Sequence, residues 1–81
     1  MKIIVCGAGQ VGFNIAKQLS SQQHDVAVID NSSSLIRKVG ESMDVQAIEG
    51  YASDPDVLDR ANAQDADMIV AVTQSDEVNM I

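Results

Sequence analysis

The chain has 81 residues, of which 46% are hydrophobic and 21% charged, and its formal net charge is -7. This balance is typical of one small globular domain and leaves no room for a separate catalytic domain. Because only 2% of the residues are aromatic and the net charge repels a phosphate backbone, nucleic acid is not an expected partner.

Cysteine content and hydropathy indicate which cellular compartment and which kinds of site to expect. The single cysteine, Cys6, can form no internal disulfide and no thiolate metal cluster, and we expect no metal site. The longest uninterrupted apolar run, Met68 to Val72, is far shorter than the roughly 20 residues that a membrane-spanning helix needs. The sequence opens on a strand pattern rather than on a signal peptide. We therefore expect a cytoplasmic protein that is not itself inserted into a membrane.

The first segment of the chain predicts a strand, a glycine turn and a helix. Residues 2–6 form a short continuous apolar run, which is typical of a buried parallel strand. The following turn has the spacing G-x-G-x-x-G, in which Gly7 permits a sharp turn, Gly9 permits close approach of a pyrophosphate, and Gly12 permits tight helix packing. A helix is predicted from about Gln10 to Ser21, with Val11, Ile15, Ala16 and Leu19 on its apolar side.

The start of this helix is the predicted phosphate site. Free amides and the helix dipole favour an anion there, and no acidic residue falls between Lys2 and Asp25. The alternative is a purely structural turn, since glycine is common in tight turns.

The second predicted strand, residues 26–29, ends in Asp30. A carboxylate at this place can accept hydrogen bonds from both ribose hydroxyls of adenosine and repels a 2′-phosphate, so NAD is favoured over NADP. The alternative for Asp30 is a helix cap, although the following residues 31–34 offer caps of their own. His24, in the preceding loop, is expected to be a solvated residue rather than a catalytic one.

A second helix and a third strand follow. Leu35, Ile36, Val39 and Met43 mark the apolar side of the helix, and residues 45–48 read as a weaker strand. Gly50 then permits close backbone approach, and Tyr51 with Ala52 is expected where adenine lies. Tyr51 either stacks on the base or shields the loop.

The last part of the chain completes an α/β pattern. Asp54 and Pro55 are expected to cap and begin a short third helix, and residues 68–72 predict a fourth strand. Strands alternating with helices predict a Rossmann-like, doubly wound parallel sheet of about four strands in the order 3-2-1-4. The crevice then lies between strands one and four, with Thr73 and Gln74 across from the glycine turn.

Four segments together resemble the N-terminal nucleotide-binding domains of the potassium-conductance-regulating family, also called RCK or KTN domains. They are MKIIVCGAGQVG, VAVID, EGYAS and DADMIVAVTQSDEVNM, and the resemblance covers essentially all 81 residues. The last two segments are more specific than the glycine motif, because simple dehydrogenases share only the first two. Two departures are visible: many relatives carry Asp where this chain has Tyr51, and their domains continue beyond the fourth helix. In this chain a fourth helix is expected to begin at Asp76 and to stop at Ile81. The chain, 1–81, is therefore expected to be one domain shortened in that helix, with its fourth strand left as an apolar edge.

The resemblance implies a regulatory module rather than an enzyme. It implies binding of NAD+ or NADH, and in relatives ATP or ADP, and control of the membrane subunit of a Trk-type potassium transporter from the cytoplasmic side. It also implies assembly as homo-oligomers. The implied contacts are Gly7, Ala8, Gly9, Gln10 and Val11 at the phosphates, Asp30 and Asn31 at the ribose, Tyr51 and Ala52 at adenine, and Thr73 and Gln74 at the crevice.

Two rival functions stay open at the level of sequence. One is a fragment of an NAD-dependent oxidoreductase, which needs an acid or base at the nicotinamide, where neither His24 nor Cys6 is expected to point. The other is a regulatory domain of the same family that prefers ATP or ADP, since Asp30 accepts any ribose diol.

Overall fold

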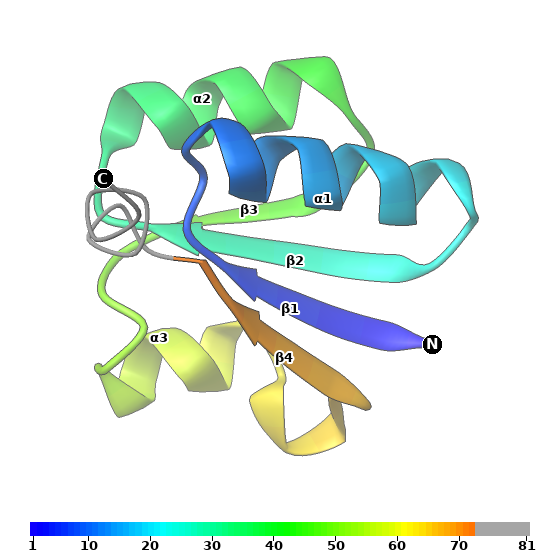
Figure 1. Cartoon of the computed structure of the whole chain (residues 1–81). Helices are drawn as coiled ribbons and strands as arrows, with labels where there is room; N and C mark the ends of the chain where they lie inside the picture. The colour runs from blue at the N-terminus through cyan, green and yellow to red at the C-terminus, as the bar shows by residue number, and fades with distance from the viewer. Residues whose placement is uncertain (73–81) are drawn as a thin grey trace, which may run out of the picture.

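The computed structural model describes residues 1–72 and contains one four-stranded sheet between two layers of helix (Figure 1). The sheet order is β3-β2-β1-β4 and every pairing is parallel, which confirms the predicted Rossmann-like arrangement. In chain order the elements are β1 (Lys2–Cys6), α1 (Gln10–Ser21), β2 (Asp25–Asp30), α2 (Ser33–Ser42), β3 (Gln46–Glu49), α3 (Pro55–Arg60), the 3-10 turn η1 (Ala63–Asp65) and β4 (Met68–Ala71).

The two central strands are covered on both faces. Alternate residues of β1 and β2 pack toward α1 and α2, Ile3 and Val28 among them, and the residues between them pack toward α3, including Ile4 and Ile29. Double coverage explains why these strands read as continuous apolar runs rather than as alternating ones.

β4 is the edge strand of the sheet within residues 1–72, where it pairs with β1 alone. Met68 and Ile69 are 48% and 52% exposed although they belong to the longest apolar run of the sequence. The predicted apolar edge at the fourth strand is therefore confirmed.

The first helix begins and ends where the sequence predicted, but one of its apolar residues does not face the sheet. Val11 is 43% exposed, and Gly12 is buried in its place. The side of α1 that faces the sheet thus has Gly12 and Ala16, which are buried, and Ile15 and Leu19, which are partly buried. This is a helical spacing whose first member has no side chain to reveal it. Phe13, which lay outside the predicted apolar side, packs against the core and has the Lys38 Nζ 5.3 Å from its ring centroid.

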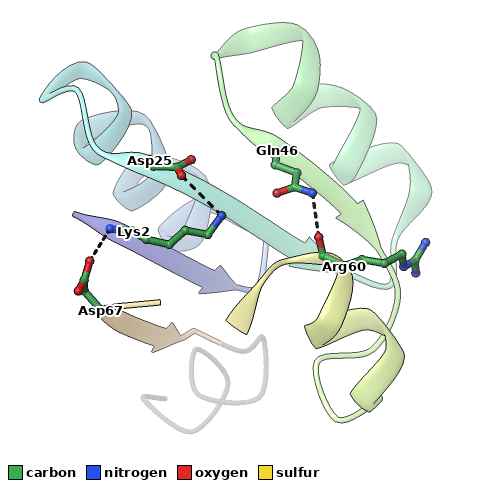
Figure 2. Close-up of polar contacts among 5 residues, drawn as sticks. All are labelled: Lys2, Asp25, Gln46, Arg60 and Asp67. Carbon is green, nitrogen blue, oxygen red and sulfur yellow. Dashed lines mark hydrogen bonds and ion pairs between the residues drawn. The ribbon is translucent and has the colours of Figure 1, made fainter. Parts of the chain in front are cut away.

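Polar contacts fix the outer elements to the sheet at the ends of the strands opposite the glycine turn (Figure 2). Asp67, just before β4, accepts a hydrogen bond from the Lys2 amide at 2.8 Å and donates its own amide to the Lys2 carbonyl. The Gln46 side chain donates to the carbonyl of Arg60 at 3.0 Å, which ties the end of α3 to the start of β3. The Lys2–Asp25 ion pair at 3.6 Å is largely exposed at its carboxylate and contributes little.

The starts of the later helices follow their capping residues. Asp54 caps α3 by accepting from the Asp56 amide at 2.9 Å, and Pro55 is the first helical residue, as predicted. Within residues 1–72, no helix is long and apolar enough to cross a membrane.

Candidate functional site

A cavity of about 420 Å³ opens at the carboxyl ends of the central strands, where the loops after β1, β2 and β3 meet. Its volume lies in the usual range of small-molecule sites. The lining residues are Cys6, Gly7, Gly9, Gln10, Ile29, Asp30, Asn31, Leu35, Gly50, Tyr51, Ala52 and Val72.

The glycine turn forms one wall of this cavity and fits only without side chains at two positions. Gly7 has φ +117°, and a Cβ built there would lie 1.7 Å from the Val72 carbonyl oxygen. A Cβ on Gly12 would lie 2.0 Å from the carbonyl oxygen of Gly7, so the first turn of α1 packs directly on the glycine turn. The Gly7 amide donates to the Ile29 carbonyl at 2.7 Å, which ties the turn to β2.

The first turn of α1 begins at the wall of the cavity. Gly9 is the N-cap residue, so no side chain caps the helix there, and the first turn contains no acidic residue. The first amides of any helix lack partners within the helix, and together with the helix dipole they suit an anion. Gly9 and Gln10 line the cavity at this point.

Asp30 ends β2 beside the turn, and both of its carboxylate oxygens accept hydrogen bonds. Oδ2 accepts from the Ala8 amide at 2.8 Å, and Oδ1 accepts from the Ser32 amide at 2.8 Å. The N-cap of α2 is Ser32, whose hydroxyl accepts from the Leu35 amide at 3.4 Å. The sequence offered helix capping as the alternative role of Asp30, but the residue that caps α2 is Ser32.

Most of the sequence-predicted site residues meet at this cavity, but two of the described ones do not line it. Ala8 is 2% exposed, its side chain lies in the core, and its amide is bound to Asp30. Val11 is exposed outside the lining. Thr73 and Gln74 lie outside the described residues.

The cavity also contains apolar residues that the sequence reasoning did not assign to it: Cys6, Ile29, Leu35 and Val72, together with Gly50. Cys6, Ile29, Gly50 and Val72 each lie at or just after the end of a strand, next to a predicted residue, so that position was the available signal. Leu35 lies in the first turn of α2, and its apolar helical spacing gave no such signal. His24 lines a separate opening with Asp25 and Asp44, at the other ends of the strands. Within residues 1–72, no three His, Cys, Asp or Glu side chains gather as a metal site.

Burial raises the pKa of the Cys6 thiol above its ordinary value of 9.0. The folded chain therefore holds this proton more tightly than the unfolded chain does. The stability that this proton contributes is fully present below the unfolded pKa of 9.0 and is lost as the pH rises through the raised pKa of the folded chain.

We expect the free energy of unfolding to fall more between neutral pH and about pH 10 in the parent chain than in Cys6→Ala. Urea titrations at both pH values measure this, and equal falls in the two chains would contradict it.

Comparison with known families identifies the chain. The model of the TrkA-N domain matches residues 3–81. The chain belongs to the TrkA-N domain family. The resemblance drawn from the four sequence segments is thereby confirmed.

Curated relatives in the TrkA-N family carry potassium-uptake names. The chain is 51% identical over its whole length to the Trk system potassium uptake protein TrkA of Azorhizobium caulinodans, and covers 18% of that protein. It is 49% identical over 80 residues to the TrkA of Vibrio alginolyticus, again 18% of the relative. A TrkA homolog of Pyrococcus abyssi is 40% identical, and 36% of it is covered. The chain thus spans a minor part of the relatives it matches.

A solved structure supports the fold of this TrkA-N domain. The Kef CTD of Shewanella denitrificans, solved in an AMP-bound form, superposes with a TM-score of 0.71 at 29% identity. The match covers 85% of this chain and 40% of that one.

Proposed function

We propose that the chain is the nucleotide-binding domain of a cytoplasmic regulatory subunit of a potassium uptake system, and that it binds NAD+ or NADH. The observation that carries this proposal is the meeting of the glycine turn and Asp30 at one cavity, on adjacent strand ends. The potassium-uptake names of the relatives support the wider role.

The dinucleotide would lie across the carboxyl edge of the sheet. Its pyrophosphate would accept hydrogen bonds from amides at Gly9 and Gln10, at the start of α1. The adenosine ribose would donate to Asp30 beside Asn31. Adenine would rest near Tyr51 and Ala52, and the second half of the dinucleotide would extend toward Thr73 and Gln74. The side chains of Ala8 and Val11 do not line the cavity, so these two residues would contribute to the phosphate site only by shaping the backbone of the turn.

An adenine mononucleotide, ATP, ADP or AMP, is the second candidate ligand. It is favoured by the AMP-bound form of the Kef CTD, whose fold this chain shares. Asp30 provides no discrimination here, because NADH and ATP both carry a ribose diol.

The proposed role is regulatory rather than enzymatic. A nucleotide can shift a transporter between two states only if the domain binds that nucleotide with different affinity in each state. We therefore expect the transporter subunit to contact the domain differently when the nucleotide is bound. We propose that the domain acts within a homo-oligomer held peripherally at the inner face of the membrane by the potassium-transporter subunit. An oxidoreductase fragment is the rival, and it would be favoured by turnover of NADH with a carbonyl substrate.

Calorimetric titration with NAD+, NADH, NADPH, ATP, ADP and AMP tests the binding proposal. We expect NAD+ or NADH to bind and NADPH to bind at least about tenfold more weakly, because its 2′-phosphate meets the Asp30 carboxylate. Amide chemical shifts of Gly9, Gln10 and Gly12 should move on binding, whereas those around His24 should not. If all six nucleotides leave the amides of the glycine turn unmoved in a folded sample, the proposed function is wrong. Tighter binding of ATP or AMP than of NADH would select the second candidate.

A further inference from the structure

The carboxylate of Asp30 joins two loops that belong to different parts of the cavity. One oxygen accepts from Ala8, inside the glycine turn, and the other accepts from Ser32, at the start of α2, each at 2.8 Å. We infer that Asp30 is a positioning residue that holds the phosphate-binding turn in shape before any ligand arrives. This inference rests on the proposed function and adds a second role to the ribose contact.

The Ala8 amide needs this partner. Ala8 is 2% exposed, so water reaches its amide poorly, and a buried donor without an acceptor is costly. A hydrogen bond from a backbone amide to a carboxylate is also stronger than one to a neutral oxygen. The contact therefore fixes the chain at Ala8, one residue before Gly9 and two before Gln10, the residues that face the cavity.

Both roles fit on one carboxylate at the same time. An ionised carboxylate has about four acceptor positions, and the two backbone amides use two of them. The remaining two suffice for a ribose diol. An asparagine has a single acceptor oxygen, and its amide nitrogen would face one of the two donors, so it cannot replace Asp30 in the free protein.

The backbone tie from Gly7 to Ile29 does not depend on the Asp30 side chain. Loss of the carboxylate should therefore release Ala8, Gly9 and Gln10 while leaving the turn attached to β2. The expected effect is local to the phosphate side of the cavity, although Asp30 itself lies at the end of β2.

A ligand without ribose hydroxyls separates the two roles. We compare ATP with 2′,3′-dideoxy-ATP in the parent chain, Asp30→Ala and Asp30→Asn by calorimetry. A residue that acts on the ribose alone leaves dideoxy-ATP binding unchanged, or strengthens it, because a negative charge near the phosphates has gone. A positioning residue weakens it, and we expect a loss of about tenfold in Asp30→Ala, the effect of one hydrogen bond to a charged group. A loss of affinity for dideoxy-ATP therefore distinguishes a positioning role from a ribose contact alone.

Amide hydrogen exchange tests the same inference without any ligand. We expect the Ala8 amide to exchange at least about tenfold faster in Asp30→Ala and Asp30→Asn, relative to the amides of Ile4 and Val28 in the same sample. Because the exchange of the core amides reports global stability, a general loss of stability would move all three together. The exchange measurement needs no nucleotide, so it tests the positioning role even if no nucleotide binds. Failure of the proposed function and failure of this inference are therefore distinguishable.

Ser32→Ala is the matched control. It removes the hydroxyl that caps α2 through Leu35 but keeps the Ser32 amide and the Asp30 carboxylate. Ala8 exchange and dideoxy-ATP affinity should match the parent chain. Unchanged Ala8 exchange in both Asp30 variants, or dideoxy-ATP bound by them as tightly as by the parent, would overturn the inference. If Asp30→Ala does not fold, Asp30→Asn carries the same two readouts.

Discussion

Replacing Gly12 with alanine is expected to lower the free energy of unfolding by about 3 kcal/mol, the upper part of the range for overpacking. The added Cβ would lie 2.0 Å from the Gly7 carbonyl oxygen and 2.8 Å from its carbon. Both atoms are backbone, so no side-chain rotation relieves the contact, and α1 must move away from the glycine turn. A domain of this size has only about 4 to 12 kcal/mol of total stability, so the loss is severe. Urea denaturation followed by circular dichroism measures it.

Gly40→Ala is the matched control, because Gly40 also lies within a helix, α2. The nearest atom to its added Cβ is that of Ala47 at 3.7 Å, an ordinary contact. Alanine should here stabilise the chain by about 0.5 to 1 kcal/mol, since glycine loses more backbone freedom on folding. Equal stability of the two variants would mean that α1 does not approach the turn as closely as described.

The architecture was predictable because its signals are local. Continuous apolar runs identify β1 and β2, and Asp54 with Pro55 identifies the start of α3. The strand order followed from the alternation of strands and helices, since crossovers in parallel sheets have one hand. The predicted third strand, residues 45–48, differs from β3 by only one residue at each end.

What could not be predicted depends on contacts between distant residues. Pairing of the Asp30 carboxylate with the Ala8 amide joins residues 22 positions apart, and it exists only once the glycine turn has its shape. Burial of Gly12 in place of Val11 escaped the apolar pattern because glycine has no side chain to count. The cavity residues Cys6 and Leu35 were missed for a related reason. Cys6 ends a strand and Leu35 lies in the first turn of a helix, and an apolar pattern does not show which of its residues face a ligand.

Gly9→Val is expected to weaken nucleotide binding severely and to lower the free energy of unfolding by only about 1 kcal/mol, since valine is a poorer N-cap of α1 than glycine. This is the converse of Gly12→Ala. Gly9 has φ −66° and ψ −170°, a conformation open to residues with side chains, so valine imposes no backbone strain there. Its side chain would stand at the cavity wall, where the pyrophosphate must approach the first amides of α1.

Since hydrogen bonds to a charged group are strong and depend on distance, we expect affinity for NADH or ATP to fall at least about 100-fold, or ~2.7 kcal/mol. Calorimetry measures the affinity and urea denaturation the stability. Gly9→Ala, with a smaller side chain, should lose less affinity than Gly9→Val. Retained affinity in Gly9→Val would mean that the nucleotide does not lie against this turn. A large loss of stability would instead assign Gly9 a packing role like that of Gly12. The two glycines thus separate the motif into a position that the fold requires and a position that the ligand requires.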